Sequence, residues 1–110
     1  MSGVSARRRK PARTFAALGD PTRLELVARL SGGEQQSITE LSDGLALSRQ
    51  AVTKHLQVLS DAGLVRRKRI GRESRFAMQP QAIAGARDYL ARVSAQWDAA
   101  IARLRALVEE

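Results

Sequence analysis

Four side chains that can recognise DNA base edges occur close together between residues 49 and 54. At about 100° per residue they share one face of a helix, and an apolar face with Val52, Leu56 and Leu59 lies opposite. Arg and Lys donate to guanine O6 and N7, Gln bonds adenine N6 and N7, and Thr contacts a thymine methyl group or a phosphate. The pattern predicts a helix that enters the major groove through Arg49, Gln50, Thr53 and Lys54.

The flanking residues predict a helix-turn-helix around these side chains. Ser37 and Glu40 have the spacing of a capping box and start a short helix. A turn near Gly44 follows, and Ser48 then caps the second helix, which ends before Gly63. The N-terminus of that second helix, with Ser48, is a natural phosphate site.

A basic hairpin is expected directly after this motif. Residues 64–70 and 74–78 have strand character, and Gly71-Arg72-Glu73 forms the turn between them. The net charge of the chain is +8, and much of the excess lies in this hairpin and in a second cluster between Arg7 and Arg13. Because a strand alternates its faces, about half of the hairpin cations can face a nucleic acid. The six basic residues of the hairpin are Arg66, Arg67, Lys68, Arg69, Arg72 and Arg75.

The segments before and after these elements predict three further helices. A first helix should cover about Ala12 to Leu18, and Asp20-Pro21 should start a second, with Leu24, Val27 and Leu30 as its apolar stripe. A long last helix begins at Pro80, and its apolar stripe is longer than so small a domain can cover. This favours a dimer seam to which the first helix contributes, over packing within one protomer. The seam candidates are Phe15, Leu18, Leu90, Val93, Trp97, Ile101 and Leu104.

Length and composition limit the alternatives. With 110 residues the chain fits one domain, which we place at 12–108 after a disordered basic arm at 1–11. There is no Cys, no apolar run of about 20 residues and no signal-peptide pattern, so we expect a cytoplasmic protein with no membrane contact. The expected fold class is mainly α with a small β-hairpin.

Two segments of the sequence resemble the ArsR/SmtB family of bacterial winged-helix repressors. They are residues 15–24 (FAALGDPTRL) and 47–59 (LSRQAVTKHLQVL), the latter continuing to AGLV at 62–65. The resemblance covers about residues 12–108 and implies a winged helix-turn-helix of order α-α-α-α-β-β-α. It implies a homodimer that is built from the first and last helices and binds double-stranded operator DNA. The hairpin would then place Arg72 toward the minor groove, with Arg67, Arg69 and Arg75 as candidates for phosphates.

The sequence departs from its family at the metal sites. At the positions of a known cysteine motif it has Ser37, Thr39 and Ser42, and hydroxyl groups are poor ligands for thiophilic ions. The last helix has Asp88 and Asp98 but no His, and the only His, at position 55, is expected to be structural. We therefore predict no metal site and no cofactor. A small-molecule inducer and plain autorepression both stay open.

Two other functional classes are weighed against a specific DNA-binding regulator. An enzyme is disfavoured because the chain has no nucleophile beside a base and no Gly-rich phosphate loop. A protein-interaction module or a non-specific DNA-binding protein is the better rival. Salt dependence and competition with random DNA would distinguish these from sequence-specific binding. The operator, the regulated genes and the choice between repression and activation are not set by the sequence.

Overall fold

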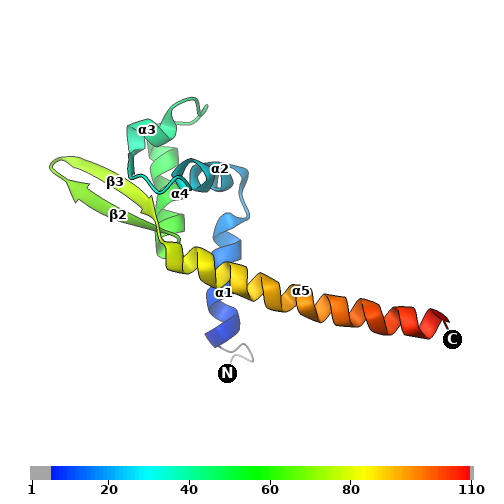
Figure 1. The fold of residues 1–110 in the computed structure, drawn as a ribbon. Coiled ribbons are helices and arrows are strands. Elements are labelled where there is room, and N and C mark those ends of the chain that lie inside the picture. Colours follow the sequence, from blue (N-terminus) through cyan, green and yellow to red (C-terminus); the bar gives the residue numbers. More distant parts are fainter. Residues whose placement is uncertain (1–5, 110) are drawn as a thin grey trace, which may run out of the picture.

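The computed structural model describes residues 6–109 of the chain. A compact group of helices carries a β-hairpin that projects on one side, and a long last helix extends away on the other (Figure 1). In chain order the elements are α1 (Ala6–Leu18), α2 (Pro21–Leu30), β1 (Gln36–Ser37), α3 (Ile38–Ser42), α4 (Arg49–Asp61), β2 (Val65–Ile70), β3 (Glu73–Met78) and α5 (Pro80–Glu109). Within this range, no helix combines the length and apolar character that crossing a bilayer requires.

The helix starts are fixed by local side-chain hydrogen bonds, as predicted. The Asp20 carboxylate accepts from the Arg23 backbone N–H at 3.0 Å, directly before α2. Ser37 and Glu40 form a complete capping box at α3. Ser48 accepts from the backbone N–H of the third residue of α4 at 3.1 Å. These bonds satisfy N–H groups that lack partners in the first helical turn, so they determine where each helix begins.

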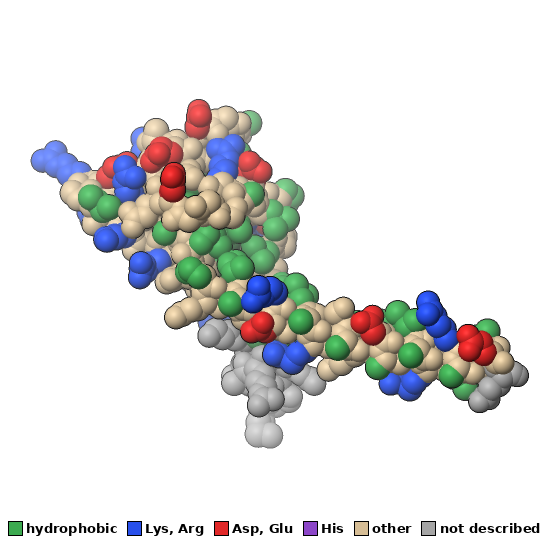
Figure 2. Space-filling model, in the orientation of Figure 1, with side chains coloured by type: hydrophobic (Ala, Val, Ile, Leu, Met, Phe, Trp, Pro, Cys, Tyr) green, Lys and Arg blue, Asp and Glu red, His purple; other side chains and the backbone are tan. Residues whose placement is uncertain are grey.

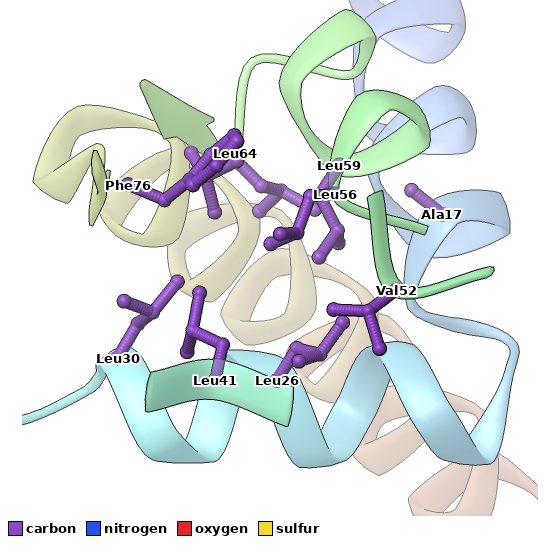
Figure 3. Packing of buried hydrophobic residues seen from close by; sticks show 10 residues of the cluster. Ala17, Leu26, Leu30, Leu41, Val52, Leu56, Leu59, Leu64 and Phe76 are labelled. Carbon is purple, nitrogen blue, oxygen red and sulfur yellow. The ribbon is translucent and has the colours of Figure 1, made fainter. Parts of the chain in front are cut away.

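One hydrophobic core joins α2, α3, α4 and the base of the hairpin. Its side chains point toward one another from these elements, and Phe76 and Leu64 close the hairpin side (Figure 3). The predicted stripe of α2 was wrong at one position. Leu26 and Leu30 are buried and Val27 is partly buried, whereas Leu24 is 52% exposed. Leu26 and Leu30 lie one turn apart on the face that meets α4, and Leu24 lies about 200° around the helix from Leu26.

The sheet has three antiparallel strands in the order β1-β3-β2. The hairpin of β2 and β3 was predicted, and Gly71 at its turn adopts the positive φ of 63° that glycine tolerates. The edge strand β1 was missed. It pairs Gln36 with Phe76 and Ser37 with Arg75, and two residues are too few to show an alternating pattern.

The two terminal helices differ from expectation in opposite ways. The disorder expected for residues 1–11 is wrong for residues 6–11, because α1 begins at Ala6 and not near Ala12. Ala, Arg and Lys favour helix, and α1 can extend backward from its end near Thr14 and Ala17, which are buried. Residues 1–5 lie outside the described part of the chain. Helix α5 spans 30 residues from Pro80 as predicted, and none of its described residues is buried.

Candidate nucleic-acid interface

Helix α4 separates its apolar and polar residues onto opposite faces. Val52, Leu56 and Leu59 are completely buried against the core. Arg49, Gln50 and Lys54 are exposed, and Thr53 is half-buried. The wheel predicted from the sequence is therefore confirmed, and the burial of one face holds the four candidate DNA-contacting side chains on the outer face.

Thr53 offers DNA a different group from the other three residues. Its hydroxyl donates to the Arg49 carbonyl at 2.8 Å, one turn back along α4. The hydroxyl hydrogen is therefore used within the helix. The methyl group is the part of Thr53 best suited to a base, and a thymine methyl group is its natural partner.

Two adjoining hollows lie between α4 and the hairpin turn. The first has a volume of about 560 Å³ and is lined by the four polar residues of α4 together with Ile38 at the start of α3. The second, of about 490 Å³, is lined by residues from the start of α3, from α4 and from both sides of the hairpin turn, including Arg49, Ile70 and Arg72. Ile38 and Arg49 line both hollows, so the surface from α4 to the turn is continuous. The contribution of Ile38 and Thr39 to this surface was not predicted from the sequence.

The hairpin cations divide between the two faces of the sheet. Arg67 lies opposite Phe76 and Arg69 opposite Ser74, whereas Lys68 lies opposite Arg75. Directly paired residues share a face in an antiparallel sheet, so Arg67 and Arg69 occupy one face and Arg75 the other. All residues of β2 after Val65 are exposed. Lys and Arg side chains project from this part of the molecule in Figure 2.

The side-chain partners distinguish these arginines further. Arg75 lies 3.8 Å from a Glu40 oxygen and 3.4 Å from a Glu73 oxygen, so two carboxylates already oppose its charge. Arg67 donates to the Ser74 hydroxyl through Nε at 3.1 Å and Nη2 at 2.9 Å. Arg72 follows Gly71 in the turn and is exposed. Of the four hairpin arginines that the sequence singles out, Arg75 is the one whose charge is locally balanced.

Two carboxylates at helix starts have lowered pKa values. The hydrogen bond from the Arg23 backbone N–H is the main cause for Asp20, and nearby positive charge adds to it. For Glu40 the hydrogen bond from the Ser37 backbone N–H is the main cause of the lower pKa, followed by the Ser37 hydroxyl and the Arg75 charge. Both groups are therefore held in the ionised form by the structure that they cap.

His55 takes part in a structural contact at the start of α2. Its Nδ1 lies 3.1 Å from Arg23 Nη1 and 3.8 Å from the Asp20 carboxylate. The His55 ring thus lies between the first turn of α2 and the residue that caps it. The ring is partly buried, as predicted for a histidine that supports the fold.

A short capped helix, a turn, an amphipathic second helix and a basic hairpin define a winged helix-turn-helix protein. A family profile described as a helix-turn-helix domain matches residues 18–68. The HTH-type transcriptional regulator Rv2034 of Mycobacterium tuberculosis is 38% identical over 84 residues, which cover 76% of this chain and 78% of that protein. The uncharacterised HTH-type regulator YuzN of Bacillus subtilis is 44% identical over 64 residues, which cover 53% of this chain and 70% of YuzN.

A solved structure of known family has the same fold as this chain. An ArsR-like transcriptional regulator from Rhodococcus sp. RHA1 aligns with a TM-score of 0.76 and 36% identity, over 90% of this chain and 92% of the other. The chain belongs to the ArsR/SmtB family of winged-helix transcriptional regulators. It is a DNA-binding transcriptional regulator and not an enzyme.

Proposed function

We propose that the chain is a homodimeric, sequence-specific repressor that reads its operator with α4 and steadies the complex with the hairpin. The continuous surface from Arg49 to Arg72 carries this proposal, because it joins the outer face of α4 to the hairpin turn. Arg49, Gln50, Thr53 and Lys54 would contact base edges, and the helix start at Ser48 would bind a phosphate. Arg72 would enter the minor groove, and the phosphate backbone of the DNA would be contacted by Arg67, Arg69 and Arg75. Of these three, Arg75 would contribute least, because Glu40 and Glu73 already oppose its charge.

The dimer is proposed from the apolar stripe of α5. At about 100° per residue, Leu90, Val93, Trp97, Ile101 and Leu104 all fall within about 40° of Trp97. Trp97 is 66% exposed and Leu104 is 62% exposed, so the stripe lacks cover within the described protomer. A homodimeric winged helix-turn-helix domain from Mycobacterium bovis shares the fold, with a TM-score of 0.64 and 24% identity. Hydrophobic side chains run along α5 in Figure 2.

Helix α1 would border this seam. The Phe15 ring lies 5.8 Å from the Tyr89 ring, centroid to centroid, and so fixes α1 against α5. Leu18 packs against the core of its own protomer. Phe15 and Leu18 therefore make intramolecular contacts first, and their proposed part in the dimer is to position α5. We infer that the domain begins with α1, at Ala6, and extends to residue 108, with α5 as its dimerisation helix.

Repression without a metal site is part of the proposal. A probable mercury resistance repressor of Streptomyces lividans is 39% identical over 67 residues, which cover 61% of this chain and 53% of that protein. Here the positions of the family's cysteine motif are occupied by hydroxyl groups, two of which are engaged in α3 itself. Ser37 accepts from the Glu40 backbone N–H, and Ser42 donates to the Ile38 carbonyl at 2.6 Å. DNA binding would take place in the cytoplasm.

Fluorescence anisotropy tests the proposal. A labelled fragment from upstream of the gene is titrated with the full chain at two salt concentrations, with excess random DNA present. We expect nanomolar binding that survives the competitor, and a loss of about 1–3 kcal/mol of binding free energy in Arg49→Ala. Arg103→Ala removes the same charge from α5 and serves as the control. Equal effects of the two variants, or binding that the competitor abolishes at every candidate operator, would contradict specific recognition by α4.

A further inference from the structure

We propose that a pocket between α1, α5 and the end of α4 binds a small uncharged aromatic molecule, and that this binding alters the affinity for DNA. The pocket has a volume of about 350 Å³. Ligand pockets commonly measure roughly 300–1,000 Å³, so one or two fused rings would fit. Its lining is Pro11, Thr14, Ala62, Gly63, Gln79, Gln81, Ala82, Gly85, Ala86 and Tyr89.

The chemistry of the lining selects the ligand. None of the described lining residues is an acid or a base of the Asp, Glu, Lys, Arg or His type, although 27% of the chain is charged. A charged ligand would lose water there without gaining an opposite charge. Alanine and glycine residues make much of the wall apolar, and Tyr89 contributes an aromatic ring that also lies 5.8 Å from the Phe15 ring and 5.9 Å from the Arg92 guanidinium carbon. Within the described part of the chain, the side-chain amides of Gln79 and Gln81 make no hydrogen bond, so they can serve one polar group on the ligand.

The pocket borders the proposed dimer seam. On the α5 wheel, Gly85 and Tyr89 fall about 120° and 80° from Trp97, whereas Ala86, which also lines the pocket, falls about 20° from Trp97 and so lies on the side of the seam residues. The α1 residues Pro11 and Thr14 form the opposite wall. A second copy seated on the seam would therefore cover the edge of the pocket at Ala86, and the proposed ligand would occupy the part between α1 and the side of α5 with Gly85 and Tyr89.

The position of the pocket couples it to the DNA-binding elements. Ala62 is the C-cap of α4, and its backbone N–H donates to the Val58 carbonyl at 3.1 Å. Gly63 turns the chain into β2, and the Gln79 N–H donates to the Leu64 carbonyl at 2.8 Å. A ligand that contacts these residues would favour one placement of α4 and the hairpin against α1 and α5. Any difference in its affinity for two such placements becomes a change in DNA affinity.

Indole is a suitable probe, because it is uncharged, aromatic and carries one N–H donor. It is titrated into the full chain labelled with ¹⁵N, and backbone amide shifts are followed by NMR. We expect saturable shifts that include the amides of Gly63 and Gly85. Gly85→Leu should abolish them by filling the pocket, whereas Gly85→Ala should keep them. A Cβ at Gly85 would meet no heavy atom within 4 Å, so Gly85→Ala fits without movement of the backbone.

A second variant tests the site through a different interaction from that of Gly85→Leu. Gln81→Leu replaces an amide by an apolar side chain of similar size and should weaken indole binding about three- to tenfold. Shifts confined to Trp97–Val108, shifts that persist in Gly85→Leu, or an absence of saturable shifts would overturn the site. The NMR result does not depend on DNA binding, so it stands even if the proposed function fails.

The second part of the proposal, that binding in the pocket changes the affinity for DNA, rests on the proposed function and is tested by measuring operator affinity. Indole at saturation should change operator affinity by at least about fivefold in the unmodified chain and in Gly85→Ala, but not in Gly85→Leu. An unchanged affinity in the presence of bound indole would overturn the coupling and leave the pocket as a binding site alone.

Discussion

Replacing Trp97 by alanine tests the dimer seam most directly. A buried Trp covers roughly 150–250 Å². Since 66% of Trp97 is exposed in the protomer, a partner could cover about 100–165 Å² more. At about 25 cal/mol per Å² this corresponds to about 2.5–4 kcal/mol for each protomer. Such values are upper bounds, but a dimer contains two copies, so we expect a loss of at least about 3 kcal/mol.

That loss corresponds to a dimer dissociation constant at least about 100-fold higher. Sedimentation equilibrium of the full chain measures it. The chain has a single Trp, so dilution of the unmodified protein should also shift the emission of Trp97 to longer wavelength as the dimer dissociates. Arg103→Ala, about 120° around the helix from Trp97, is the control and should leave the dissociation constant within threefold.

The reasoning fails if Trp97→Ala dimerises as tightly as Arg103→Ala. It also fails if the unmodified protein is monomeric at tens of micromolar, because the stripe would then have no self-association to explain. A weakened dimer should bind the operator more weakly as well, since two half-sites about one helical turn apart need two joined subunits.

Four further predictions follow from the site. Arg72→Ala should weaken binding to operator and random DNA alike and reduce the slope of log binding constant against log salt concentration by about one. Arg75→Ala should change affinity and slope less, because Glu40 and Glu73 already oppose the charge of Arg75. Fluorescence anisotropy at several salt concentrations compares the two variants. Thr53→Val should preserve operator affinity, while Thr53→Ala should cost about 0.8 kcal/mol by removing the methyl group, and equal losses in both would contradict this role. Glu40→Gln should lower the melting temperature at pH 7. Because folding lowers the Glu40 pKa, the ionised carboxylate stabilises the fold above the ordinary pKa of 4.5, and this stabilisation is lost as the pH falls through the lower pKa of the folded state. The melting temperatures of the unmodified protein and of Glu40→Gln should therefore converge in acid. Micromolar zinc should leave operator affinity unchanged, and a clear loss would reveal a metal site.

The features best predicted from the sequence are those that depend on near neighbours. Asp20, Ser37 and Ser48 each cap a helix through a backbone N–H three residues ahead, so the sequence contains the whole interaction. The two faces of α4 follow from helical periodicity in the same way. The outer face could therefore be assigned residue by residue, because burial of Val52 and Leu56 leaves only one orientation for Arg49 and Gln50.

The features that were missed depend on distant partners. Leu24, Leu26 and Leu30 are equally apolar, and only the position of α4 decides which two are buried. Strand β1 exists because Gln36 and Ser37 meet the exposed edge of β3. No local pattern in two residues could show this pairing. The start of α1 was misplaced because a composition rule for basic arms ignores a helix that extends from a packed end.

The hairpin shows why charge alone is a poor guide to DNA contacts. Its basic residues look equivalent in the sequence, yet β1 brings Ser37 opposite Arg75 and so places Glu40 of the capping box near that arginine. The same carboxylate that starts α3 thus reduces the charge that Arg75 can offer to phosphate. Arg72 lies in the turn beyond the reach of β1, where it lines the hollow that it shares with Arg49. Strand β1 therefore adds Glu40 to the surroundings of Arg75, which the charge pattern of the sequence alone does not show.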